Sequence, residues 1–269
     1  MRIDFRKMHG LGNDFIVLDN RDGRLPHLGA ATIRSLSDRR SGIGCDQFIL
    51  LEAHEAADAL MRIFNADGTE VEACGNAARA IGLLLGERAT LATKGGTITI
   101  TPAGEDIAVD MGVPRFEWDA IPLAYAMDTL AMPVGWHGLE RPCAVNVGNP
   151  HVVFFVEPDT PIGLASIGEE IETDPLFPDK VNVNVASVLD RQTIRLRVWE
   201  RGVGLTRACG TGACATAVSA MRRGLTERVV TVRLPGGALQ IDWGKDDRIT
   251  MTGPATEAFR GSFELSDYS

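Results

Sequence analysis

The sequence lacks the residue patterns that mark several common protein classes. Its five cysteines form no Cys-x-x-Cys pair, and its five histidines show no metal-ligand spacing. We therefore expect free thiols, no disulfide framework and no bound metal. Positive charge is also scarce, because 27 Lys and Arg residues face 36 Asp and Glu residues and leave a net charge of −9. This balance, without a basic cluster, argues against a nucleic-acid partner.

Long apolar runs are missing as well. The first residues, MRIDFRKMHGLGNDF, carry charges throughout and contain no apolar stretch long enough for a signal peptide or a membrane span. The sequence therefore predicts a cytoplasmic protein without a membrane partner. Hydrophobic residues make up 45% and charged residues 23%, which is typical of a chain that folds around a packed core.

What the sequence does contain is an internal duplication with an offset of about 135 residues. MRIFNADG at 61–68 lies over LRVWERGV at 196–203, and TITITPAG at 97–104 resembles VTVRLPGG at 230–237 after a small deletion. Other residues that the duplication pairs are Gln47 with Asn182, Asn65 with Glu200, Cys74-Gly75 with Cys209-Gly210 and, at a shift of 136, Gly12-Asn13 with Gly148-Asn149. These ordered matches predict two similar halves.

Each half is expected to be mostly strand, with one helix. Runs such as FIVLD, FILLE, HVVFFV and TIRLRVW are typical of short strands. Helical spacing of small and apolar residues extends from Cys74 to about Glu87 and from Cys209 to about Arg223, with Gly86 and Gly224 where the helices should stop. The stretch from 112 to 142 is rich in Pro, Gly and Trp and predicts the crossing between halves.

Both predicted helices begin at a cysteine, and this placement suggests acid–base chemistry. Unpaired N–H groups and the helix dipole place partial positive charge at a helix start, which favours bound carboxylate and lowers the pKa of a cysteine from its ordinary value of about 8.5. If the halves face each other, Cys74 and Cys209 can act on opposite faces of one carbon, removing a proton on one side and returning it on the other. The sequence therefore predicts an epimerase.

We expect this chemistry to need no cofactor. The α-hydrogen of an amino acid is a weak acid, but the two helix starts can stabilise the developing carbanion through its carboxylate. Four lysines are present, Lys7, Lys94, Lys180 and Lys245, and none has a context typical of a Schiff base.

Two other classes remain open from the residues alone. A cysteine hydrolase or thiol-redox protein would use one nucleophile and leave the other cysteine dispensable. A binding module would use the helix starts to hold carboxylates without turning them over. The remaining cysteines, Cys45, Cys143 and Cys214, are interpreted as small buried hydrophobic residues.

The sequence resembles the diaminopimelate epimerase family over nearly its whole length. The motifs that carry the resemblance are MHGLGNDFIVLD, GIGCDQFILLE, FNADGTEVEACGNAARA, VGNPHVVFF, FPDKVNVNVA and ERGVGLTRACGTGACATA. The resemblance implies an α+β fold of two pseudo-symmetric domains, each a β-barrel-like sheet wrapped around a central helix. We expect an N-terminal half over residues 1–114, with the tail 256–269 packed back on it, and a C-terminal half over residues 115–255.

The resemblance also implies an activity and a set of site residues. The activity is conversion of LL-2,6-diaminopimelate to the meso form, a step in lysine and cell-wall precursor synthesis, by a homodimer. Cys74 and Cys209 are implied as the acid–base pair, and His151 and Glu200 as residues that tune them. Substrate contacts are implied for Asn13, Gln47, Asn65, Gly75, Asn76, Asn149, Asn182, Glu200, Arg201, Gly210 and Thr211.

Rivals within the same reaction class are proline racemase-like and histidine racemase-like enzymes, which also use paired cysteines. They offer no reason for the adjacent Glu200 and Arg201, whereas an anion and a guanidinium together complement the distal amino-acid end of diaminopimelate. The choice between these substrates therefore depends on that dipeptide.

Overall fold

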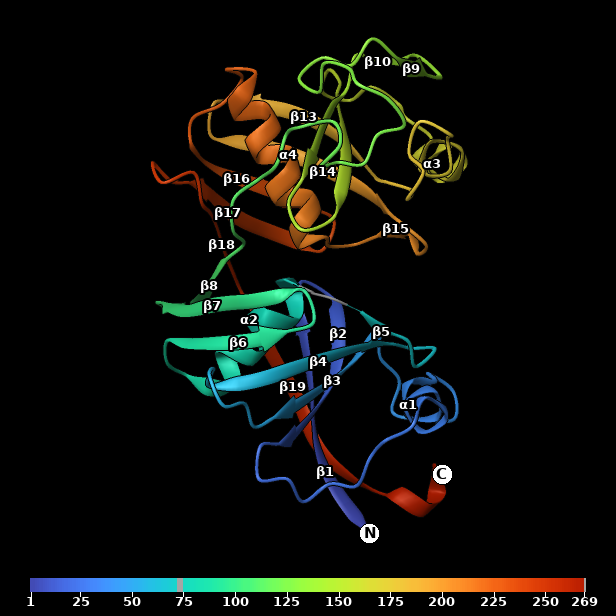
Figure 1. The fold of residues 1–269 in the computed structure, drawn as a ribbon, viewed down its shortest axis with the longest axis vertical. Coiled ribbons are helices and arrows are strands. Elements are labelled where there is room, and N and C mark those ends of the chain that lie inside the picture. Colours follow the sequence, from blue (N-terminus) through green and yellow to red (C-terminus); the bar gives the residue numbers. More distant parts are fainter. Residues whose placement is uncertain (72–74, 269) are drawn as a thin grey trace. The chain divides into compact units, whose positions relative to one another are not determined.

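The computed structural model of the chain describes residues 1–71 and 75–268; the predicted catalytic residue Cys74 lies outside the described residues. The chain forms two units, Met1–Val109 with Gly253–Ser269, and Asp110–Thr252 (Figure 1). The first unit therefore contains both ends of the chain. Among the described residues, no helix has the length and apolar character needed to cross a bilayer.

Over its described residues, the first unit is built from a twisted set of strands and two α-helices. Its elements are β1 (Arg2–Gly10), β2 (Asn13–Asn20), α1 (Ala30–Ser37), β3 (Gln47–Glu52), β4 (Ala59–Asn65), β5 (Glu70–Val71), α2 (Gly75–Leu85), β6 (Ala89–Thr93), β7 (Gly96–Ala103), β8 (Asp106–Asp110), β19 (Thr256–Glu264) and the 3₁₀ turn Leu265–Asp267. Strand β1 pairs antiparallel with β2 and with β19, so the C-terminal strand extends the sheet of the N-terminal unit.

The second unit repeats this order. Its elements are β9 (Gly135–Trp136), β10 (Leu139–Glu140), β11 (Cys143–Asn146), β12 (Pro150–Phe155), α3 (Leu164–Glu172), β13 (Asn182–Asp190), β14 (Thr193–Glu200), β15 (Gly204–Thr206), α4 (Gly210–Arg222), β16 (Val229–Leu234), β17 (Gly237–Trp243) and β18 (Ile249–Gly253). Apart from the small β9–β10 hairpin, each strand and helix has a counterpart in the first unit.

The pairing of the strands confirms the duplication. In the first unit, β1 and β2 pair antiparallel, β2 and β3 pair parallel, and β3 and β4 pair antiparallel. The second unit has the same sequence of pairings in β11 to β14. The register agrees residue by residue at the predicted offset of 135, because Phe48 lies opposite Phe64 and Val183 lies opposite Trp199. The two halves therefore share one topology.

One of the predicted matches is wrong. TITITPAG at 97–104 covers β7, the second strand of the β6–β7 hairpin, whereas VTVRLPGG at 230–237 covers β16, the first strand of the β16–β17 hairpin. The counterpart of β16 is β6, because β16 pairs parallel with β14 as β6 pairs parallel with β4. The two segments looked alike because alternating β-branched residues before a turn are typical of any hairpin strand.

A buried helix lies at the centre of each unit. Helix α4 contacts strands β11 to β14, β16 and β17, and helix α2 contacts β1, β6, β7 and β19. Small residues permit this close packing; a Cβ added at Gly82 would lie 2.5 Å from Ile107 Cγ2. The predicted stops are confirmed, since Gly86 directly follows α2, Gly224 follows the C-cap residue of α4, and their φ angles are positive, at 72° and 68°.

The stretch between the units has more structure than a simple crossing. Its side chains Ile121, Leu123, Met132 and Leu139 are buried in the same core as Phe154 and other residues of the second unit. Its Pro and Gly residues favour an irregular backbone, and its apolar side chains pack the segment against the strands of the second unit.

Candidate active site

Cys209 is the N-cap of α4. Its backbone is extended (φ −129°, ψ 110°), and the Gly212 N–H of the first helical turn donates to its Sγ at 3.3 Å. Thr211 Oγ1 lies 3.5 Å from the same sulfur, and the residue is 3% exposed. The Cys209 sulfur therefore caps the helix, a role that a side-chain oxygen usually has.

The sequence predicted that the helix start lowers the pKa of the cysteine, but for Cys209 the net shift is upward. Burial raises the pKa of the Cys209 thiol well above its ordinary value, and the nearby Glu200 carboxylate raises it further. Hydrogen bonds from Thr211 and Gly212 act in the opposite direction but are outweighed. Two effects disfavour a thiolate here: burial removes water from around the sulfur, and Glu200 places a negative charge beside it. Neither effect is visible in a local sequence pattern.

Glu200 and Arg201 end β14 and begin the turn toward β15. The Thr206 hydroxyl donates to Glu200 Oε1 across this turn. The Arg201 backbone N–H donates to Asn182 Oδ1 at 3.0 Å, and its guanidinium donates to the Asp179 carbonyl at 2.8 Å. Two predicted substrate contacts, Asn182 and Arg201, are thus joined directly.

A second group of predicted residues lies on the parallel strands β12 and β13. His151 is fully buried, with Nε2 2.8 Å from Asn149 Oδ1 and Nδ1 3.0 Å from Asn184 Nδ2. Burial lowers the pKa of His151 to about 3, so the ring is neutral near pH 7. Sequence reasoning missed Asn184, although a second asparagine in the apolar run VNVNVA was a signal of a buried polar contact.

In the first unit, predicted residues also contact one another. Asn76 Nδ2 donates to Asn13 Oδ1 at 3.0 Å, which joins the start of α2 to the start of β2. Asn13 Nδ2 in turn donates to Asp46 Oδ2 at 3.0 Å. Gln47 lies opposite Asn65 in the β3–β4 pair, and their side chains are 3.5 Å apart.

Sequence reasoning also missed Arg79, which lies in α2 with no exposed surface. Its Nη2 donates to Asn76 Oδ1 at 2.9 Å, and its Nε donates to the Pro254 carbonyl at 3.2 Å. An arginine in the apolar helix sequence GNAARAIGLLL was the available signal, since a buried guanidinium must be hydrogen-bonded. Its contact fixes the orientation of the Asn76 amide.

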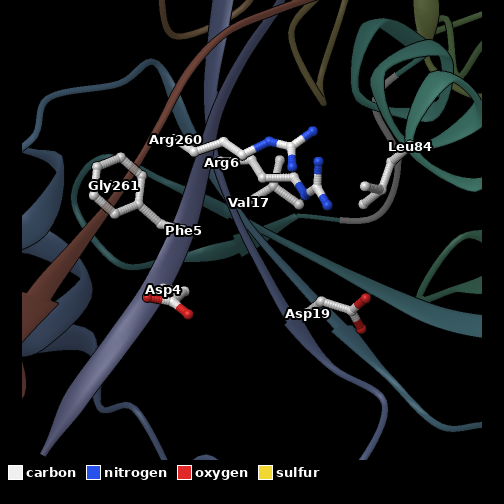
Figure 2. A pocket seen from close by; sticks show the side chains of 8 residues that line it. All are labelled: Asp4, Phe5, Arg6, Val17, Asp19, Leu84, Arg260 and Gly261. Carbon is white, nitrogen blue, oxygen red and sulfur yellow. The ribbon is translucent and has the colours of Figure 1, made fainter.

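A pocket of about 510 Å³ lies in the first unit but contains none of the predicted site residues. Figure 2 shows its lining side chains, among them Arg6 and Arg260, which lie opposite each other in the β1–β19 pair. Both arginines contact Glu257, whose single negative charge offsets one of their two positive charges. In the part of the chain that the structure describes, no group of three or more His, Cys, Asp or Glu side chains is placed to hold a metal ion.

The predicted site residues thus contact one another within each unit. In the first unit these contacts form two pairs, Asn13 with Asn76 at the start of α2, and Gln47 with Asn65 across strands β3 and β4. In the second unit they join Arg201 with Asn182, Asn149 with His151, and Cys209 with Thr211 and Glu200. Gly75 and Gly210 are the first residues of α2 and α4.

Comparison with known proteins agrees with this architecture. A family model described as "Diaminopimelate epimerase" matches residues 5–117 and 143–257. A diaminopimelate epimerase of Erythrobacter litoralis (strain HTCC2594) is 66% identical over the full length of both chains, and one of Rhizorhabdus wittichii is 60% identical over 100% of this chain and 98% of its own. A solved structure titled as a predicted epimerase from Pseudomonas aeruginosa has a TM-score of 0.68 at 17% identity, covering 97% of this chain and 99% of that one, and it confirms the two-unit α+β fold.

The family interconverts the LL and meso forms of diaminopimelate in lysine and cell-wall precursor synthesis, and it does so without pyridoxal phosphate. The match covers both units and includes both helix-start cysteine motifs. This chain belongs to the diaminopimelate epimerase family.

Proposed function

We propose that this chain converts LL-2,6-diaminopimelate to meso-2,6-diaminopimelate, with Cys74 and Cys209 as the two acid–base groups. The observation that carries the proposal is the N-cap position of Cys209, buried beside Glu200 at the start of a central helix. Cys74 immediately precedes the corresponding helix α2 in the other unit. The full-length likeness to enzymes named diaminopimelate epimerase supports the same substrate.

In the proposed reaction, one cysteine thiolate takes the α-proton, and the C–H electron pair stays on the carbon as a carbanion. The thiol of the other cysteine then gives a proton to the opposite face, which inverts the centre and leaves the second sulfur as thiolate. A thiol that burial and Glu200 keep protonated, such as Cys209, is suited to donate that proton. In the reverse direction the two cysteines exchange roles.

The other predicted residues hold the substrate. Backbone N–H groups at Gly75 and Asn76, and at Gly210 and Thr211, bind the reacting carboxylate, where they stabilise the carbanion. Side chains of two kinds are proposed to hold the rest of the molecule: amides that donate to carboxylate, and the Glu200–Arg201 pair that complements an amino-acid end. These amides are Asn13, Gln47, Asn65, Asn149 and Asn182. Glu200, through its charge, and His151 are proposed to tune the cysteines.

The decisive experiment measures epimerisation of LL-diaminopimelate by a chiral assay in heavy water. The wild-type enzyme is expected to produce the meso form with deuterium at the inverted α-carbon. Cys74→Ala and Cys209→Ala are each expected to abolish net inversion, while Cys214→Ala, a buried position in the same helix α4, should retain it. Normal inversion by either of the first two variants would contradict two-base chemistry.

The same assay separates the rival functions. Turnover of proline or histidine instead of diaminopimelate would favour the other racemase types, and dependence on a single cysteine would favour a hydrolase or a redox protein.

We also propose a homodimer in the cytoplasm. The family resemblance supports the dimer. Cys45, Cys143 and Cys209 are free thiols, which is typical of a reducing compartment and supports the location. Sedimentation of the purified protein and fractionation of cells test the two statements.

A further inference from the structure

Asn184 is a polar residue in an apolar part of the second unit. It lies in β13 with no exposed surface. Its Nδ2 is 3.0 Å from the Val152 carbonyl oxygen, 3.4 Å from the Asn182 carbonyl oxygen and 3.0 Å from His151 Nδ1. Two of these neighbours are carbonyls, which can only accept hydrogen bonds, so the NH₂ end of the amide must face them. The orientation of the Asn184 amide is therefore fixed.

This orientation determines where His151 carries its hydrogen. One amide hydrogen of Asn184 is donated to the Val152 carbonyl, and the other is donated to His151 Nδ1, which must therefore present its lone pair. The ring is neutral, because it is fully buried and its pKa is about 3. Its single N–H is then on Nε2, 2.8 Å from Asn149 Oδ1.

Asn149 is thereby held with a defined polarity. Its carbonyl oxygen accepts from His151, so its NH₂ group is turned away from the ring, and the residue is half-buried whereas His151 is fully buried. A carboxylate accepts hydrogen bonds and cannot donate them. If the Asn149 amide were turned the other way, its oxygen would face a bound substrate carboxylate and repel it.

The first unit shows that the fold does not need this polar pair. Strands β2 and β3 pair in the same register as β12 and β13: Val17 lies opposite Ile49, as Val153 lies opposite Asn184. The position corresponding to His151 is Phe15, and like Ile49 it has no exposed surface. The same topology is thus built with an apolar pair in one unit and with a polar pair in the other.

The polar pair also costs stability. Asn184 Oδ1 is buried and has no hydrogen-bond partner among the residues that the structure describes. It lies against the first turn of α4, where a Cβ added at Gly212 would be 2.8 Å from it. A group kept in a core at such a cost is expected to serve something other than folding.

We propose that Asn184 is a positioning residue for the reaction proposed above, acting through His151. It holds His151 as the neutral tautomer with hydrogen on Nε2, and His151 holds Asn149 with its amide hydrogens directed at a substrate carboxylate. The proposal rests on the proposed function, in which Asn149 contacts the substrate.

The test combines kinetics with nitrogen NMR of histidine-labelled protein. In the wild type, His151 is expected to show an unprotonated Nδ1 and a protonated Nε2 between about pH 6 and 8, with its signals assigned by their loss in His151→Phe. Asn184→Leu, which keeps the side-chain shape without the donors, is expected to raise KM for LL-diaminopimelate about tenfold, with a smaller change in kcat, because the contact holds the substrate rather than the reacting carbon. Ser187→Ala, another buried polar position of β13, is the matched control and should leave KM unchanged.

The double variant His151→Phe, Asn184→Ile copies the apolar pair of the first unit. It is expected to fold with a melting temperature no lower than that of the wild type, yet to show the raised KM of Asn184→Leu. A hydrogen on Nδ1 in the wild type, or a rise in KM of less than about threefold in Asn184→Leu, would overturn the proposal. Failure of the wild type to epimerise diaminopimelate would instead refute the proposed function, since the tautomer is measured without substrate.

Discussion

Replacing Glu172 by glutamine tests how the turn that carries Glu200 and Arg201 is held. Glu172 ends α3 and is 4% exposed. Its carboxylate accepts from Trp199 Nε1 at 2.8 Å, from the Gly202 backbone N–H at 3.0 Å and from Lys180 Nζ at 3.3 Å. All three partners are donors. An amide in place of the carboxylate must therefore point its own donors at one of them.

The magnitude follows from this mismatch. A hydrogen bond to a charged group is worth about 1.5–3 kcal/mol, and leaving a buried donor unsatisfied costs a similar amount. Glutamine keeps one accepting oxygen and loses the charge and the second acceptor, so we expect Glu172→Gln to lower the free energy of unfolding at pH 7 by about 2–3 kcal/mol. For a domain of this size that corresponds to a fall in melting temperature of roughly 4–12 °C.

The effect should depend on pH in a defined direction. Burial alone would raise the pKa of Glu172, but the hydrogen bonds from Trp199, Gly202 and Lys180 outweigh it and lower the pKa below its ordinary value of 4.5. Because the folded-state pKa lies below that of the unfolded chain, the stabilisation is present above about pH 4.5 and is lost as the pH falls below that value. The difference between the wild type and Glu172→Gln should therefore shrink in acid.

Thermal and denaturant unfolding, followed by circular dichroism between pH 3.5 and 8, measures this difference. Glu170→Gln is the control, since Glu170 lies in the same helix but is exposed and pairs with His137 at the surface, where an ion pair is worth about 0–1 kcal/mol. A Glu172→Gln variant no less stable than Glu170→Gln at pH 7, or a difference that stays constant down to pH 3.5, would refute the reasoning.

Two further predictions concern the same unit. Glu200→Gln should lower the pKa of Cys209, because the Glu200 carboxylate raises it. The pH dependence of iodoacetamide labelling, followed by mass spectrometry of the Cys209 peptide, measures this pKa. A labelling midpoint at the same pH as in the wild type, or at a higher pH, would contradict the prediction. Gly168→Ala should destabilise the protein although alanine favours a helix by about 1 kcal/mol, because the new Cβ would lie 2.3 Å from Trp199 Cδ2 and overpacking costs about 1–3 kcal/mol. Its control is Ser166→Ala, an exposed position of the same helix that should not lose stability, and a Gly168→Ala variant as stable as this control would show that Trp199 yields at no cost.

The sequence determined much of this protein because its strongest signals are local or repeated. Alternating apolar residues located the strands, small apolar residues at helical spacing located α2 and α4, and the offset of 135 residues predicted two units of one topology. These patterns reflect the faces that strands and helices bury, which each segment encodes by itself. The family followed from the motifs around Asn13, Gln47, Asn149 and Cys209.

The tertiary structure decided what depends on residues far apart in the chain. The hairpin match at 97–104 failed because a strand's partner is set by the sheet and not by its own sequence. The raised pKa of Cys209 depends on its burial and on Glu200, nine positions away in sequence. The contact of His151 with Asn184 spans 33 residues and exists because β12 and β13 pair in parallel at one register. A local pattern can predict that such side chains are buried, but only packing determines which groups they meet.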